Sequence, residues 1–106
     1  MIKAVFTEKQ GRVFRAEIDG HAEFADPGKD VVCAAVSSAC YMAVNTVTDV
    51  IRSDAKVSDD KKRGRMRCEI KDESPAARQV LEGLRLHLEQ LALQYPGYIT
   101  VTTEES

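Results

Sequence analysis

The spacing of the apolar residues changes near residue 31, and this change constrains the fold more than any other feature. From Val31 to about Ile51 the apolar residues recur at steps of three and four, which predicts one long helix with a wide apolar face. Asp30 stands directly before this segment and is its expected N-cap. Small residues dominate the first half, so we expect this helix to lie close against a sheet.

Segments on both sides of this helix alternate apolar and polar residues, which predicts half-buried strands. The predicted strands are residues 2–7, 12–19, 65–71 and 98–103, with a short additional strand at 55–58. A polar stretch ending in Gly11 joins the first two strands, which predicts an antiparallel hairpin. In the second strand, Phe14, Ala16 and Ile18 are expected to face the same side.

A second helix completes the predicted order of elements. It begins at Pro75, with Ser74 as its cap, and ends before Pro96. Strand, strand, helix, one or two strands, helix and strand is the order of an α+β domain. We expect a two-layer sandwich in which a mainly antiparallel sheet of four or five strands carries two helices on one face. Residues 1–106 have room for a single core and are expected to form one domain.

Composition argues against several classes of partner. The formal net charge is −2, which gives no electrostatic basis for binding nucleic acid or an acidic membrane surface. The basic run at residues 61–67 is expected to be the solvated edge of a hairpin. We identify no apolar run of the length of a signal peptide or of a membrane span, which needs about 18 residues. We therefore expect no direct nucleic-acid or membrane partner.

The cysteines and histidines argue against a disulfide framework and a metal site. Three cysteines are an odd number, which fits a reducing cytoplasm. There is no Cys-x-x-Cys pair, and the two histidines lie too far apart for zinc-ligand spacing. We expect neither a metal nor a cofactor. Cys68 is expected to be a core thiol, and His87 to border the packed face of the second helix.

His21 and Cys33 are the candidates for chemistry. Cys33 falls near the third position of the predicted helix, where free amides and the helix dipole favour a thiolate, the species that attacks a carbonyl. The same amides, of Cys33 and Ala34, could bind the resulting oxyanion. The loop of residues 22–30 holds few residues that would bury themselves, and it could close over a substrate. Spacing alone favours a surface histidine and a packed thiol. The place of Cys33 at the start of the helix makes a catalytic pair an equal alternative.

The residues around this pair resemble the ribosomal-processing cysteine protease family of bacteria, known as Prp and earlier as YsxB-like proteins. The family pattern is Gly-His-Ala, a loop, Gly-x-Asp, two apolar residues, Cys-Ala-Ala, an apolar residue and Ser. The matching residues are Gly20, His21, Ala22, Gly28, Asp30, Val31, Val32, Cys33, Ala34, Ala35, Val36 and Ser37. The resemblance extends over the whole chain in length and in the order of elements.

The resemblance implies a cytoplasmic cysteine endopeptidase without a cofactor. Members remove a short N-terminal extension from one large-subunit ribosomal protein, whose mature N-terminus reaches toward the peptidyl-transferase centre. His21 matches the catalytic base of the family, and Cys33 matches its nucleophile. A homodimer is also implied. The supporting motif positions are matched by Gly20, Gly28, Asp30 and Ser37, of which the glycines are expected to serve loop geometry.

Two other functions are compatible with the sequence. The chain could be a ribosome-associated binding module in which the thiol is incidental. It could also be a thiol redox sensor, because Cys40 follows Cys33 by two helical turns and lies on the same side of the predicted helix.

Overall fold

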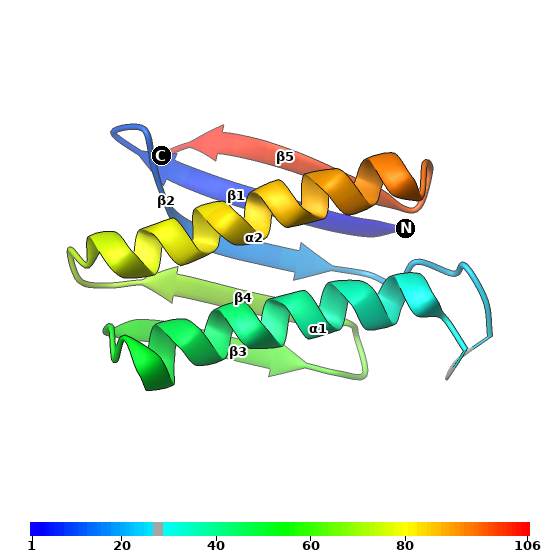
Figure 1. The fold of residues 1–106 in the computed structure, drawn as a ribbon, viewed down its shortest axis with the longest axis horizontal. Helices are drawn as coiled ribbons and strands as arrows, with labels where there is room; N and C mark the ends of the chain where they lie inside the picture. Colours follow the sequence, from blue (N-terminus) through cyan, green and yellow to red (C-terminus); the bar gives the residue numbers. More distant parts are fainter. Residues whose placement is uncertain (27–28) are drawn as a thin grey trace.

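The computed structural model describes residues 1–26 and 29–106. Five strands form one sheet, and two long helices cover one of its faces (Figure 1). The elements in chain order are β1 (Ile2–Lys9), β2 (Arg12–Asp19), α1 (Val31–Asn45), a π-helical segment η1 (Thr46–Val50), β3 (Ala55–Asp60), β4 (Arg65–Ile70), α2 (Pro75–Gln94) and β5 (Ile99–Glu105). The predicted α+β sandwich is confirmed.

The sheet has the strand order β3-β4-β2-β1-β5 and is mainly antiparallel. The pairs β1–β2, β2–β4 and β3–β4 are antiparallel, whereas β1 and β5 run parallel. The parallel pair arises because α2 carries the chain back along the sheet, so that β5 runs in the same direction as β4 (Figure 1). The short strand expected after the first helix is present as β3 and forms one edge.

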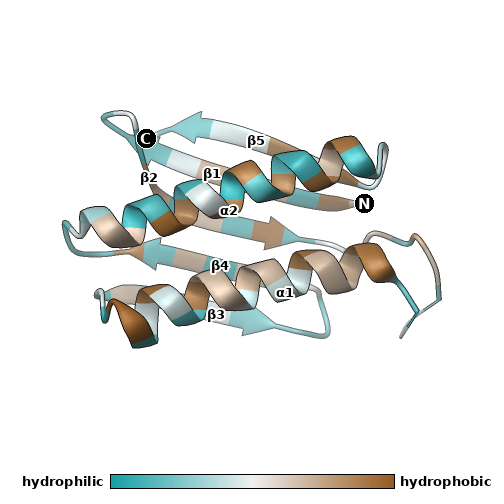
Figure 2. Cartoon of the chain, viewed as in Figure 1, coloured by the Kyte–Doolittle hydropathy of each residue, from teal (hydrophilic) through white to brown (hydrophobic). Residues whose placement is uncertain are grey.

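The core lies between the inner face of the sheet and the helices. In α2 the buried residues follow steps of three and four, and they are Ala77, Leu81, Leu84, Leu88 and Leu91. Figure 2 shows the result as hydrophobic and hydrophilic residues that alternate around α2. From the sheet, Phe6 and Cys68 are fully buried, so Cys68 is the core thiol that the alternation predicted.

A β-bulge changes which residues of β2 face the core. The register between β1 and β2 shifts near Phe14, which has no partner in the ladder. Phe14 is only half-buried, whereas its neighbour Val13 is completely buried. The prediction that Phe14 faces inward is therefore wrong, because a bulge inserts one extra residue and reverses the inward face beyond it.

The first helix continues through η1, so its helical extent is close to the predicted end at Ile51. By length and composition alone, Val31–Val50 is long and apolar enough to cross a membrane. The expectation that no segment has this property is therefore wrong. In the structure Val32, Val36 and Cys40 of this segment are buried in the core. Packing of one helix face against a sheet demands the same apolar composition.

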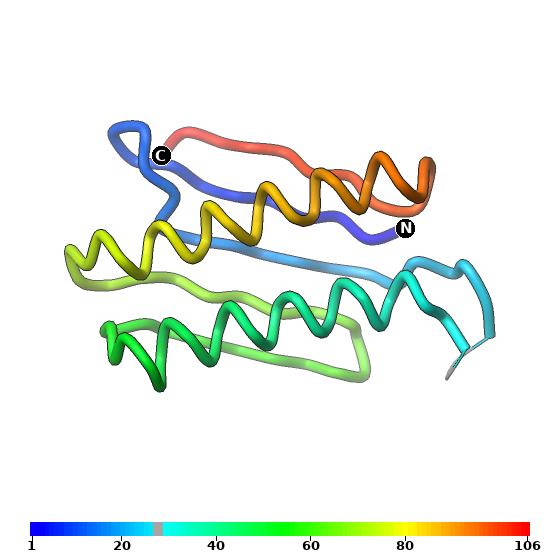
Figure 3. The backbone as a smooth tube through the Cα atoms, viewed as in Figure 1, coloured from blue at the N-terminus to red at the C-terminus, as the bar shows by residue number. Residues whose placement is uncertain are grey.

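Segments that are far apart in the sequence meet at one end of the sheet. The loop after β2, the start of α1 and the turn between β3 and β4 all lie at this end, together with the N-terminus of the chain (Figure 3). Backbone hydrogen bonds hold this end together. The amide of Gly20 donates to the carbonyl of Gly64 across 2.9 Å, and the amide of Ile2 donates to the carbonyl of Tyr98 across 2.9 Å. This end carries the candidate site.

Candidate active site

Cys33 stands in the first turn of α1. Asp30 caps the helix, because its Oδ1 accepts hydrogen bonds from the amides of Val32 and Cys33, both at 3.0 Å. The predicted helix start and its N-cap are thus confirmed. The thiol of Cys33 is free and its residue is half-buried. At this end of a helix the macrodipole favours a negative charge.

The helix-end amides that were expected to bind an oxyanion are occupied. The amide of Cys33 donates to the side chain of Asp30. The amide of Ala34 donates to the backbone carbonyl of Asp30 across 3.1 Å. The prediction that these two amides are free is wrong for this conformation, because the cap residue engages both of them.

A different backbone amide reaches the sulfur of Cys33. The N–H of Ala22 donates to Sγ across 3.2 Å. Ala22 is also buried, so the chain that leaves β2 packs against the first turn of α1. The neighbouring residue His21 is thereby held at the end of α1 that carries the thiol, and the two residues line the same cavities. Sequence reasoning missed this donor, because the contact belongs to the backbone and the side chain carries no signal for it.

The loop after β2 is anchored in its first half. Phe24 packs edge-on against Tyr95 and Tyr98, with ring centroids 5.6 and 5.1 Å apart. The amide of Phe24 donates to Oδ2 of Asp30 across 2.9 Å. Ala22 is the one buried residue among the described loop residues, and Phe24 is 42% exposed, so the expectation that few loop residues are buried holds although the Phe24 ring contacts two tyrosines. Motion of the loop over a substrate would have to break these contacts.

Asp30 joins the loop to the helix through its two carboxylate oxygens. Partial burial by itself would raise the pKa of Asp30, but hydrogen bonds from the amides of Cys33, Phe24 and Ala25 outweigh it and hold the pKa below the ordinary 3.8. The carboxylate is therefore ionised at neutral pH. Its place in the site is structural: one oxygen holds the loop and the other holds the turn that carries Cys33.

His21 follows Gly20 directly after β2 and is exposed. Gly20 has a φ of +102°, and a Cβ atom at this position would lie 2.4 Å from the carbonyl oxygen of Met1. Only glycine lets the backbone leave the strand with this conformation so close to β1. The structure thus supplies a physical reason for glycine at position 20. The other motif glycine, Gly28, lies outside the described residues.

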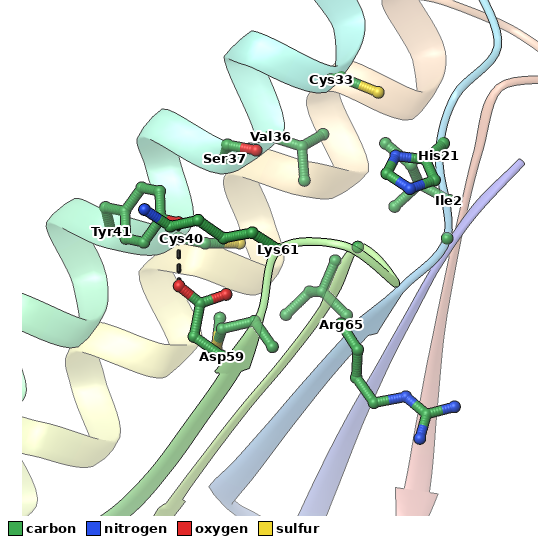
Figure 4. Close-up of a pocket in the computed structure, with 14 residues that line it drawn as sticks. Ile2, His21, Cys33, Val36, Ser37, Cys40, Tyr41, Asp59, Lys61 and Arg65 are labelled. Carbon is green, nitrogen blue, oxygen red and sulfur yellow. Dashed lines mark hydrogen bonds between the residues drawn. The ribbon is translucent and has the colours of Figure 1, made fainter.

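Two cavities meet at His21 and Cys33. The first, of about 330 Å³, lies between α1 and the turn that joins β3 to β4 (Figure 4). The second, of about 890 Å³, lies on the side of the loop that follows β2. Both cavities are lined by His21, Cys33 and Ser37. A polypeptide that crosses the imidazole and the thiol therefore has open space on either side.

The walls of the two cavities differ in chemistry. Apolar residues such as Val36 and Met66 line the first cavity together with charged residues of both signs, Asp59, Lys61 and Arg65. The second is bordered by three acidic residues, Glu23, Asp26 and Asp30. The sequence placed Val36 and Asp30 in the motif around Cys33, but it did not show that the strands and the β3–β4 turn complete the first cavity.

A contact between α1 and β3 borders the first cavity. The hydroxyl of Tyr41 donates to Oδ2 of Asp59 across 2.9 Å (Figure 4). This hydrogen bond, with a lesser effect of burial, raises the pKa of Tyr41. The ammonium of Lys61 lies 5.7 Å from the centroid of the Tyr41 ring. Sequence reasoning did not single out Tyr41 or Asp59, since neither belongs to a recognisable motif.

Cys40 lines the first cavity but differs from Cys33 in its chemistry. Burial, with a smaller effect from the charge of Asp59, raises the pKa of Cys40 to about 12. Both cysteines lie in the regular part of α1, where seven residues rise about 10.5 Å. A disulfide needs Cα atoms about 4.4–6.8 Å apart. Cys33 and Cys40 therefore cannot form one while α1 is intact.

Comparison with known proteins places this site in a family. The family model described as "Cysteine protease Prp" matches residues 1–100. The chain belongs to the Prp family of cysteine proteases. A curated Prp relative, the ribosomal processing cysteine protease Prp of Bacillus subtilis strain 168, is 30% identical over 109 residues, which cover 97% of each chain. The Prp resemblance predicted from the motif is confirmed, and with it the class of enzyme.

Solved Prp structures share the fold. The structure of S. aureus Prp in complex with a covalently linked product peptide has a TM-score of 0.92 and 24% identity, and covers 98% of this chain and 100% of its own. S. aureus Prp in complex with a substrate peptide has a TM-score of 0.86 and 23% identity, with coverage of 98% and 100%. These likenesses establish the Prp arrangement of a five-stranded mixed sheet with two helices.

Proposed function

We propose that this chain is an endopeptidase that removes the N-terminal extension of a large-subunit ribosomal protein during ribosome maturation. In this proposal Cys33 is the nucleophile and His21 is the general base. The observation that carries it is the pair of cavities that meet at these two residues, since a peptide bound across them would present one bond to the thiol. The name of the Bacillus subtilis relative supports a ribosomal substrate.

The reaction we propose is acyl transfer in two stages. His21 takes the proton of the Cys33 thiol, and the thiolate forms a C–S bond with the scissile carbonyl carbon. The carbonyl becomes an oxyanion. When it collapses, the C–N bond breaks and His21 gives its proton to the leaving amine. Water then attacks the thioester while His21 takes a proton from it, and cleavage of the C–S bond restores the thiol.

The hydrogen bond from Ala22 supports the first proton transfer. An N–H aimed at sulfur stabilises the thiolate more than the neutral thiol, because the ionised acceptor makes the stronger hydrogen bond. Asp30 accepts backbone hydrogen bonds from both the loop and the helix, and it thereby fixes the turn that carries Cys33. The site therefore combines a capped helix with a dedicated donor to sulfur.

The structure weighs differently on the two alternative functions. A redox sensor that joins Cys33 to Cys40 is disfavoured, because the spacing along α1 prevents the disulfide and Cys40 is held as a neutral thiol. A binding module with an incidental thiol differs from a peptidase only in its chemistry. An experiment on cleavage has to separate these two.

The test is incubation of the protein with a peptide that spans the extension and the mature N-terminus of the ribosomal protein, followed by mass spectrometry. We expect two products from a single cut. Cys33→Ala should leave the peptide intact while binding survives, and Cys40→Ser should cleave as the wild type does. Equal cleavage by Cys33→Ala would disprove the assignment of the nucleophile. Binding without cleavage by the wild type would favour the binding module.

We also propose that the protein acts as a homodimer in the cytoplasm. The outer side of α1 supports self-association, because residues 31–48 contain no charged side chain and Met42 is 65% exposed. Figure 2 shows α1 as far less hydrophilic than α2. A molar mass measured by light scattering tests the dimer. Met42→Lys should lower the mass to that of a monomer if this face forms the interface, and an unchanged mass would place it elsewhere.

A further inference from the structure

The imidazole of His21 lies against the turn between β3 and β4. A Cβ atom built on Gly64 of this turn would stand 2.8 Å from Cε1 and 2.9 Å from Nε2 of His21, and 2.8 Å from the carbonyl oxygen of Gly20. These separations are shorter than real Cβ contacts allow. The imidazole of His21 therefore occupies space that a side chain at position 64 would need.

The turn is also fixed to the strand that carries His21. The carbonyl of Gly64 accepts a hydrogen bond from the amide of Gly20 across 2.9 Å. One residue further out, Arg65 pairs with Asp19 across 3.4 Å. Both contacts join the β4 end of the turn to the end of β2, and they hold Gly64 beside the imidazole.

A general base has to keep its ring oriented toward the group that it deprotonates. In many sites a third side chain does this by a hydrogen bond to the far ring nitrogen. Among the hydrogen bonds of residues 1–26 and 29–106, none involves the His21 side chain. Contact with the Nε2–Cε1 edge provides another way to limit the rotation of the ring.

We propose that Gly64 is a positioning residue, whose bare backbone orients the imidazole of His21 toward Cys33. This inference rests on the proposed role of His21 as the base. It assigns to the β3–β4 turn the function that a third polar side chain has in other sites. Gly64 has a φ of +65°, a conformation that glycine adopts readily, and this conformation turns the backbone toward the ring.

The first test is Gly64→Ala beside the control Gly11→Ala. Gly11 also has a positive φ, of +76°, but nothing lies within 4 Å of its Cβ position, so the control carries the backbone strain without touching His21. We expect kcat of Gly64→Ala to fall roughly 10- to 100-fold with KM little changed, and Gly11→Ala to retain its kcat. Equal kcat values for the two variants would overturn the proposal.

The second test reads the ring itself and does not depend on peptidase activity. The chain has only two histidines, so the Hε1 signals of His21 and His87 can be assigned by replacing His87 with Gln. In the wild-type protein we expect a nuclear Overhauser effect between the Gly64 Hα atoms and Hε1 of His21. Its absence would overturn the proposal even if Gly64→Ala did not fold. Its presence in a protein that cuts no peptide would refute the proposed function and retain the contact.

Discussion

The backbone N–H of Ala22 donates a hydrogen bond to Sγ of Cys33 across 3.2 Å, although the two residues are 11 positions apart. This contact closes the loop between β2 and α1 at its base. It joins the residue after the proposed base to the proposed nucleophile, so the local chain path, rather than a long side chain, brings the pair together. The chemistry of the sulfur therefore depends on how the loop is held.

The three thiols are expected to differ in their reaction with iodoacetamide near neutral pH. Cys33 should react first, because it is half-buried beside two cavities, whereas Cys40 and Cys68 are buried. With a pKa of about 12, Cys40 is ionised to the extent of about one part in 10⁵ at pH 7. Peptide mapping after a short reaction should find the label on Cys33 alone. Early label on Cys40 would contradict the buried, neutral thiol.

Asp30 should contribute stability through its cap and its bonds to the loop. Asp30→Ala is expected to lower the free energy of unfolding by about 1–2 kcal/mol, and Asp30→Asn by less, because an amide oxygen still accepts hydrogen bonds. Urea denaturation at neutral pH measures both. Because the loop also loosens, Asp30→Ala should lower kcat/KM more than Asp30→Asn does.

The same residue predicts a pH dependence with a defined sign. The pKa of Asp30 is lower in the folded protein than its ordinary 3.8, so its contribution is present above that value and is lost as the pH falls through the folded pKa. Stability of the wild type should thus decline in acid below about pH 4. Asp30→Asn should show a shallower decline. Parallel curves for the two proteins would mean that this carboxylate is not the group involved.

Two glycine substitutions should change stability in opposite directions. Gly20→Ala is expected to cost about 2–4 kcal/mol, because the new Cβ would overlap the carbonyl of Met1 at a positive φ. Gly83→Ala should stabilise by about 0.5–1 kcal/mol, because Gly83 is exposed within α2 with nothing near its Cβ position. Thermal unfolding compares them. A neutral Gly20→Ala would show that the N-terminal strand can yield.

The aromatic contact of Phe24 should matter for catalysis as well as for stability. Phe24→Ala removes two edge-on ring contacts, each worth about 0.5–1.5 kcal/mol. We expect kcat/KM to fall roughly tenfold, because the segment that holds Ala22 and His21 loses an anchor. Leu93→Ala is the control, since that leucine is 82% exposed. If both variants kept full activity, the anchor would have no part in the site.

Most of the fold could be predicted because its elements carry local signals. The spacing of Leu81, Leu84 and Leu88 requires a helix with one buried side, and it formed as predicted. Asp30 indicated the start of α1, because an aspartate directly before an apolar helical pattern is a typical N-cap. The bulge at Phe14 escaped prediction, because it depends on how two strands align rather than on either strand alone.

The same distinction between local signals and long-range contacts applies to the candidate site. The sequence by itself determined the helix that begins after Asp30, the motif around His21 and Cys33, and the family to which they point, because these depend on residues close together in the chain. Only the tertiary structure decided which backbone groups surround the two side chains. In the folded chain Asp30 accepts hydrogen bonds from the amides of Cys33 and Ala34. Folding also places the Ala22 amide beside the sulfur and Gly64 beside the imidazole. Such contacts join segments that are distant in the sequence, and they use backbone atoms that every residue has. No pattern of side chains could therefore predict them.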